Sequence, residues 1–108
     1  MTTDHADCDD GIAFLSRLDK LIRERMVQKP EDSYVASLLA SGDKRMAQKL
    51  GEEAIELAIA VTAGDRNEQL DEAADLLFHM LVLLNAKGIR LEHVSALLEQ
   101  RHSSRCDG

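Results

Sequence analysis

Aromatic residues, proline and glycine are scarce in this sequence. Its 108 residues include one Tyr, two Phe, no Trp, one Pro and six Gly. Strands favour β-branched and aromatic residues, and all-β folds need many Gly- and Pro-containing turns. The chain is instead rich in Leu, Ala, Glu and Lys, which are strong helix formers. The composition therefore predicts an all-α fold.

Positive charge is also in short supply. The chain carries 13 Lys and Arg against 20 Asp and Glu, which gives a net charge of −7. Non-specific binding of nucleic acids depends on cations that neutralise phosphates, and anionic membranes attract basic segments. We therefore expect neither nucleic acid nor a membrane as a partner. The excess of acid suits either plain solubility or the binding of divalent cations.

We expect neither a membrane-spanning helix nor a secretion signal. No apolar run approaches the ~18 residues of a membrane-spanning helix. The first ten residues have neither the basic region nor the apolar core of a signal peptide. The two cysteines, Cys8 and Cys106, lie in polar terminal segments. A secreted domain with one disulfide is an open alternative, but we expect reduced thiols in a cytoplasmic protein.

Apolar residues recur at helical spacing in five segments. Pro30 and Gly42 interrupt the pattern in the first half of the chain, and Gly64 and Gly88 interrupt it in the second. Ser33 is a suitable N-cap for the second segment. The predicted helices are 12–27, 34–40, 43–63, 68–87 and 91–101.

The length is typical of one domain, because domains usually hold ~50–250 residues. We expect a disordered leader at 1–10, a single all-α domain at 11–102 and a disordered tail at 103–108. The two longest helices are joined by a short turn, so they should form an antiparallel hairpin.

Carboxylates on the two long helices are predicted to face one another. A helical wheel places Glu53 at the edge of an apolar stripe and Glu56 about 60° further round. On the second helix, which is apolar nearly all round, Glu72, Asp75 and His79 fall within about 60° of each other. Folding the hairpin at its turn brings all four carboxylates to similar heights, ~10–18 Å from the turn.

Four converging carboxylates repel one another unless a cation lies among them. Oxygen ligands suit Mg²⁺ or Mn²⁺, and Mg²⁺ commonly binds substrate phosphates as well. The alternative is a solvated face with ordinary ion pairs to Lys49 and Arg45. This alternative fits Glu52 better than it fits Glu72 and Asp75, which interrupt an apolar helix. His79 is either a hydrogen-bonded core histidine or a residue that orients a carboxylate ligand.

The carboxylate spacing resembles that of a known group of enzymes. Glu52-Glu53-x-x-Glu56 followed by Glu72-x-x-Asp75 resembles the signature of the all-α nucleoside triphosphate pyrophosphatases, the MazG-like superfamily. More specifically, three runs resemble the phosphoribosyl-ATP pyrophosphatase family of histidine biosynthesis. These runs are SYVASLL at 33–39, KRMAQKLGEE at 44–53 and ADLLFH at 74–79. The resemblance covers about 33–101, and Phe78 stands where that family often has Tyr.

The resemblance implies a reaction and a set of residue roles. The reaction is the Mg²⁺-dependent hydrolysis of phosphoribosyl-ATP, a small-molecule nucleotide, to phosphoribosyl-AMP and pyrophosphate, the second step of histidine biosynthesis. Glu52 would be a candidate catalytic base, or else a partner of the ligands, and Lys49 and Arg45 would contact substrate phosphates. The position of His79 on the helix, not the resemblance, makes it a candidate to orient a carboxylate ligand. The implied ligands of Mg²⁺, or of Mn²⁺ in its place, are Glu53, Glu56, Glu72 and Asp75.

Two other functions are compatible with the same sequence. One is a house-cleaning pyrophosphatase acting on dCTP, dUTP or a damaged nucleotide, which would share the metal site. The other is a non-enzymatic helical dimerisation module, against which the intact acids at all four ligand positions argue.

An assembly of several chains is expected in each case. The second long helix is apolar nearly all round, and Ile55 and Ile59 give the first a second apolar face. A monomer has too few other helices to cover both surfaces, so we expect a bundle completed by dimerisation. The resemblance likewise implies a homodimer or a dimer of dimers.

Overall fold

The computed structural model describes the backbone of residues 3–107 and the side chains of residues 11–103. Within that part of the chain all regular structure is helical, which confirms the predicted all-α fold. The five helices are α1 (Thr3–Gln28), α2 (Tyr34–Ser41), α3 (Asp43–Ala63), α4 (Arg66–Ala86) and α5 (Leu91–Asp107).

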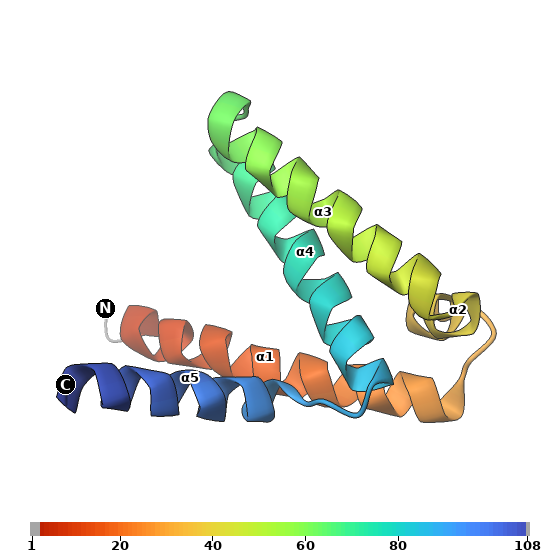
Figure 1. The fold of residues 1–108 in the computed structure, drawn as a ribbon, viewed down its shortest axis with the longest axis horizontal. Coiled ribbons are helices and arrows are strands. Elements are labelled where there is room, and N and C mark those ends of the chain that lie inside the picture. Colours follow the sequence, from red (N-terminus) through yellow and green to blue (C-terminus); the bar gives the residue numbers. More distant parts are fainter. Residues whose placement is uncertain (1–2, 108) are drawn as a thin grey trace.

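The hairpin of α3 and α4 is the central element, and Figure 1 shows the two helices running side by side. Each helix has 21 residues. At the turn, the side chain of Asp65 accepts a hydrogen bond from Glu68 N at 2.9 Å, and Glu68 Oε1 accepts one from Asp65 N at 3.4 Å. This reciprocal pair is a capping box. A Cβ at Gly64 would lie only 3.0 Å from the carbonyl oxygen of Ala60, a tight contact, so the turn favours glycine at this position.

The remaining helices gather at the open end of the hairpin (Figure 1). Ser33 caps α2 by accepting a hydrogen bond from Ala36 N at 3.2 Å. Gly42, with a φ of +91°, lets the chain turn directly from α2 into α3. The main cluster of buried apolar residues lies at this end and draws on four helices: Ile22, Val35, Leu38, Met46, Leu81 and Val82.

A buried polar junction ties α5 to this core. Asp19 on α1 is 4 % exposed. Its carboxylate accepts hydrogen bonds from Asn85 Nδ2 at 2.6 Å, from the Arg23 guanidinium at 2.7 Å and from Leu91 N at 3.1 Å. The last of these satisfies a free N–H in the first turn of α5. The sequence analysis did not anticipate this network.

Both terminal helices are longer than the apolar spacing predicted. α1 begins at Thr3 and α5 ends at Asp107, so helix continues into the segments expected to be a leader and a tail. Polar turns of a helix carry no apolar signal, and no proline interrupts either end. Met1, Thr2 and Gly108 lie outside the described residues. The division into leader, domain and tail stays a prediction.

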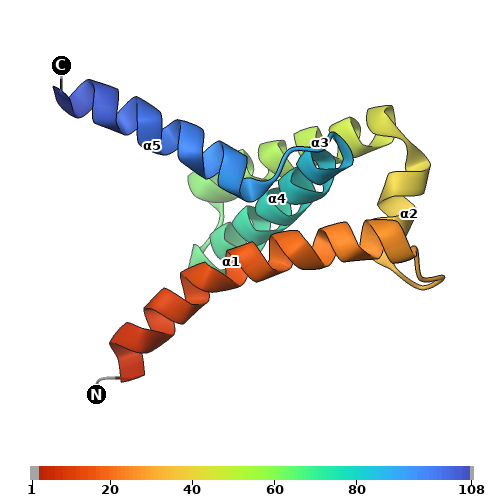
Figure 2. The ribbon, with the colours of Figure 1, turned by 90° about the horizontal axis from the view of Figure 1, so that it is seen from below.

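Within one chain, α4 is less buried than its composition suggested. Only His79, Leu81 and Val82 are buried on it, and Leu70 is 56 % exposed. Figure 2 shows α1 and α5 diverging towards their free ends instead of closing over the hairpin. Among the described residues, no helix has the length and apolar character needed to cross a bilayer.

Candidate metal-binding site

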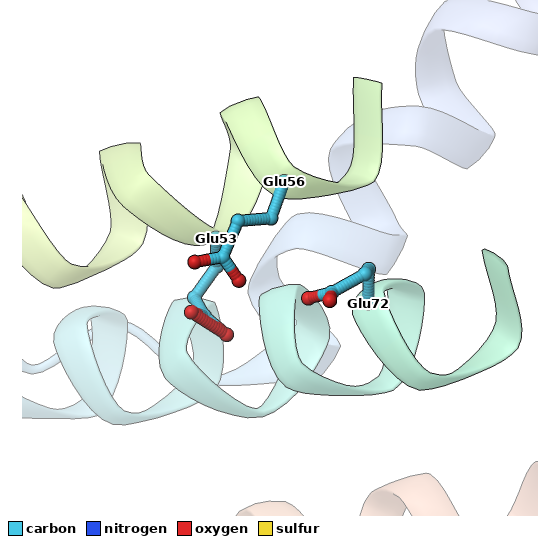
Figure 3. Close-up of side chains that lie close together, drawn as sticks. All are labelled: Glu53, Glu56 and Glu72. Atoms are coloured by element: carbon cyan, nitrogen blue, oxygen red, sulfur yellow. The ribbon is translucent and has the colours of Figure 1, made fainter. Parts of the chain in front are cut away.

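Three carboxylates converge between α3 and α4, as Figure 3 shows. Glu53 and Glu56 lie one turn apart on α3, and Glu72 faces them from α4. One oxygen of each carboxylate lies within 4.8 Å of an oxygen of the others. The hairpin therefore brings together three of the four residues that the sequence analysis named as metal ligands. We call these three residues the carboxylate cluster.

Asp75, the fourth candidate ligand, borders the cluster without joining it. It lies one turn after Glu72 on α4, and its side chain is exposed. Its charge nevertheless raises the pKa of both Glu53 and Glu72, so it belongs to the same electrostatic environment.

The surroundings of the cluster oppose ionisation. Burial is the main cause of the raised pKa of Glu53, and the carboxylates of Glu56 and Asp75 add to it. Lys49 Nζ, 3.9 Å from Glu53 Oε1, acts in the opposite direction. The pKa of Glu72 is also raised, first by burial, then by a hydrogen bond with the side chain of Glu56, and then by the charge of Glu56. A bound cation would reverse this balance by favouring the charged forms.

Glu72 provides a direct indication that the cluster is built for a ligand. Its Oε1 atom is buried, and when both Glu72 and Glu56 are ionised it has no hydrogen-bond donor among the described residues. A buried acceptor without a partner is costly. Coordination of a cation by this oxygen would remove that cost, so the donor set fits Mg²⁺ or Mn²⁺, both of which prefer oxygen ligands.

Three other predicted site residues, Lys49, Glu52 and Arg45, lie on α3 with Glu53 and Glu56. Lys49 reaches the carboxylate cluster through Glu53. Glu52 is exposed and accepts a hydrogen bond from Gln48 Nε2 at 3.2 Å. Arg45 is exposed and lies eight residues before Glu53, about 12 Å along the helix axis. The roles of Glu52 as base and of both cations in phosphate binding stay predictions.

His79 is a buried, hydrogen-bonded residue, 8 % exposed. Its Nδ1 lies 2.7 Å from the backbone oxygen of Asp75, and its Nε2 lies 2.8 Å from the hydroxyl of Tyr34. Since a carbonyl oxygen only accepts, Nδ1 carries the proton. In the neutral ring, Nε2 then accepts from Tyr34. His79 thus contacts the main chain of a candidate ligand, not a carboxylate.

The pairing of Tyr34 with His79 was missed by the sequence analysis. The two residues are 45 positions apart and lie on different helices. Nothing in the local sequence around Tyr34 signals a hydrogen bond over that separation, because it depends on how α2 packs against α4.

Comparison with known proteins identifies the relatives of this chain. A family described as phosphoribosyl-ATP pyrophosphohydrolase matches residues 15–102. The phosphoribosyl-ATP pyrophosphatase of Methylobacterium nodulans is 52 % identical over 87 residues, which cover 81 % of each protein. The histidine biosynthesis bifunctional protein HisIE of Vibrio cholerae is 46 % identical over 94 residues, which cover 87 % of this chain and 45 % of that protein.

The Escherichia coli (strain K12) protein of the same name is 51 % identical over 89 residues, which cover 82 % of this chain and 44 % of that protein. The chain therefore spans about half the length of these bifunctional relatives. The carboxylate cluster lies inside residues 15–102, which the family matches.

Proposed function

Because the chain belongs to the phosphoribosyl-ATP pyrophosphohydrolase family, we propose that it hydrolyses phosphoribosyl-ATP to phosphoribosyl-AMP and pyrophosphate in histidine biosynthesis. The convergence of Glu53, Glu56 and Glu72 inside the matched residues 15–102 is the observation that carries the proposal. A triphosphate and a carboxylate cluster are both anionic, so a divalent cation has to join them.

Mg²⁺, or Mn²⁺ in its place, is the cofactor in this proposal. The carboxylate cluster would hold it, and Asp75 would complete the ligand set from the next turn of α4. A divalent cation held there supplies positive charge against the charge that develops on the phosphoryl oxygens.

The chain's own residues have three tasks in the reaction. Glu52 takes a proton from the attacking water. The oxygen of that water bonds to phosphorus as the anhydride bond to the departing pyrophosphate breaks. Lys49 and Arg45 contact phosphate oxygens of the bound nucleotide, Arg45 with two parallel hydrogen bonds. Tyr34 and His79 hold the main chain at Asp75 and so set the position of that carboxylate.

A homodimer, or a dimer of dimers, is the proposed assembly. The accessible surface of the chain is 7929 Å², whereas a compact monomer of this mass exposes about 6,000 Å². Its radius of gyration is 16.1 Å, against about 13 Å for a compact domain of this length. Ile55 and Ile59 on α3 are 62 % and 58 % exposed. Packing of two hairpins into a bundle would cover these apolar faces.

The decisive assay measures pyrophosphate released from phosphoribosyl-ATP, with dCTP and dUTP as competing substrates, in Mg²⁺ and after chelation. We expect turnover of phosphoribosyl-ATP that requires the metal. Faster turnover of dCTP or dUTP would indicate a house-cleaning pyrophosphatase. A calorimetric titration without specific Mg²⁺ uptake, together with no turnover, would indicate a helical dimerisation module.

A further inference from the structure

A groove of about 240 Å³ lies between α1 and the start of α2, next to the residues that support Asp75. Leu18 and Leu21 on α1 form part of its apolar wall. Tyr34 and Phe78 bring two aromatic rings to it, and Arg25 and Asp32 bring one charge of each sign. Apart from the support that Tyr34 and His79 give to Asp75, none of the roles proposed above involves this groove.

The two aromatic rings form a fixed surface. The rings of Tyr34 and Phe78 are stacked, with centroids 6.0 Å apart and planes 18° apart. The hydroxyl of Tyr34 bonds to His79 Nε2 at 2.8 Å, which holds the ring in place. Even so, Tyr34 remains 49 % exposed. An immobilised and half-exposed aromatic ring is a suitable platform for stacking a nucleobase.

The platform lies within reach of the carboxylate cluster. Phe78 lies about 9 Å along the helix axis from Glu72 but on another face of α4, about 120° further round. Tyr34 provides the link, because its hydroxyl bonds to His79, which lies two turns after Glu72 on the same face of α4, about 10 Å along the axis. An extended ribose triphosphate spans such a distance. A nucleotide with its triphosphate at the cluster can therefore lay its base on Tyr34.

The charges of the groove match a particular kind of base. In phosphoribosyl-ATP a second ribose is attached at N1 of adenine, which converts the ring into an amidine that is far more basic than adenine and is a cation when protonated. A carboxylate such as Asp32 attracts that cation, and aromatic faces attract it as well. Arg25 suits the phosphate at the end of the second ribose. Unsubstituted adenine has neither the charge nor the extra phosphate.

We propose that this groove binds the purine base of the nucleotide, with Tyr34 as the stacking residue and Asp32 as the residue that selects a base substituted at N1. The inference rests on the proposed function and deepens it, because it assigns the part of the site that would distinguish phosphoribosyl-ATP from ATP.

The chain provides its own probe for this proposal. Tyr34 is the only tyrosine and there is no tryptophan, so intrinsic fluorescence near 300 nm reports on this one ring. We expect 1-methyladenosine, which is cationic, to quench the signal saturably in the presence of chelator. Adenosine should quench it at higher concentration, and ribose 5-phosphate should leave it unchanged. An unchanged signal with 1-methyladenosine would overturn the proposal.

Substitution of Asp32 tests the selectivity. Asp32→Asn should reduce the preference for 1-methyladenosine over adenosine by about fivefold or more. Glu31→Gln is the matched control, since Glu31 is exposed, adjacent in sequence and outside the groove. An unchanged preference in Asp32→Asn would refute the role of Asp32.

Two substitutions of Tyr34 separate stacking from support of His79. Tyr34→Phe keeps the ring but loses the hydrogen bond to His79, so we expect kcat to fall while KM for phosphoribosyl-ATP rises much less than in Tyr34→Leu. Tyr34→Leu should raise KM by about five- to 150-fold, the range expected for loss of one stacked base, with a melting curve to confirm folding. Equal KM values in the two variants would show that stacking contributes nothing.

These results separate the two proposals from each other. Quenching by 1-methyladenosine without hydrolysis of phosphoribosyl-ATP would leave the groove assignment standing and refute the proposed function. Hydrolysis with no quenching and no effect of Asp32→Asn would support the proposed function and refute the groove assignment.

Discussion

Glu53 is an ionisable residue whose surroundings oppose its ionisation. It is 4 % exposed, it faces two other carboxylates, and its partner Lys49 lies 3.9 Å away. Such an arrangement is unfavourable for the fold alone. It becomes useful when a cation is bound, so the side chain should contribute to activity and to stability in opposite directions.

The activity prediction concerns the candidate ligands. Glu53→Gln and Asp75→Asn each remove one negative charge with little change in shape. We expect either variant to keep less than about a tenth of the wild-type kcat at saturating Mg²⁺, a loss of more than about 1.4 kcal/mol in the barrier. Steady-state kinetics of pyrophosphate release measure this. A variant that keeps most of its turnover would remove that residue from the ligand set.

The stability prediction concerns Glu53→Gln in the absence of metal. The pKa of Glu53 is raised in the folded state above its ordinary value of 4.5, mainly by burial. The folded protein then binds more protons than the unfolded chain, so this residue lowers stability as pH rises from about 4.5 through the folded pKa. In chelator at pH 7, Glu53→Gln should therefore melt at a higher temperature than wild type, and the difference should shrink towards pH 4.

Glu52→Gln is the matched control, because Glu52 is adjacent and exposed. Its melting temperature should change little, since exposed substitutions usually stay within about 0.5 kcal/mol.

Mg²⁺ at a hundredfold excess over its Kd should stabilise wild type by about 2.7 kcal/mol. The gain should be much smaller in Glu53→Gln. An equal Mg²⁺ effect in both proteins would place the cation elsewhere.

The polar junction between the helices α1, α4 and α5 should contribute to the stability of the fold. Although burial alone would raise the pKa of Asp19, hydrogen bonds from Asn85, from Leu91 N and from Arg23 hold it below its ordinary value. Asn85→Ala removes a donor 2.6 Å from the buried carboxylate. We expect it to lower the free energy of unfolding by about 1–3 kcal/mol, the cost of a buried group that loses its partner. Denaturant unfolding measures this cost.

The exposed Asn67 provides the comparison for that measurement. Asn67→Ala, in the first turn of α4, should stay within about 0.5 kcal/mol of wild type. The contribution of Asp19 has a definite pH range, because its folded pKa is lowered. It is present above the unfolded value of about 3.8 and is lost as pH falls through the lower, folded pKa. A full Asn85→Ala effect that persisted in strong acid would contradict this account.

The helices were predictable, because their signals are local. Ser33 and Asp65 are caps, Gly42 and Gly64 are turns, and apolar spacing marks the segments between them. The carboxylate cluster was predictable for a related reason: a hairpin fixes the heights of residues on either side of its turn, so Glu53, Glu56 and Glu72 could be paired by counting.

What escaped prediction depends on packing between distant segments. Asp19 and Asn85 are 66 residues apart, and Tyr34 and His79 are 45 apart. The position of α1 and α2 relative to α4 decides both pairs, and no periodicity in the sequence reports that position. The direction of a side chain cannot be read from the sequence either. Counting residues from the turn gave the position of Asp75 along the hairpin, but not that its side chain lies at the border of the cluster.

At the scale of the whole molecule, the hairpin extends beyond the helices that could cover it. α1, α2 and α5 gather at its open end, so the half nearer the turn keeps Ile55, Ile59 and Leu70 exposed (Figure 1). Large apolar patches are unusual on monomeric proteins. A second copy of the chain, related by a two-fold axis, is the simplest cover, since each hairpin would bury the same face of the other.

Ile59→Glu tests this assembly. Burying the new carboxylates at a two-fold interface is unfavourable, so the variant should shift from dimer or tetramer towards a 12.0 kDa monomer or aggregate and lose activity. Light scattering coupled to size-exclusion chromatography measures the shift. Val27→Glu is the matched control, because Val27 is 83 % exposed and belongs to the last turn of α1, outside α3 and α4. It should leave the assembly intact. A wild-type protein that is monomeric and active at micromolar concentration would show that the exposed faces of the hairpin serve another purpose.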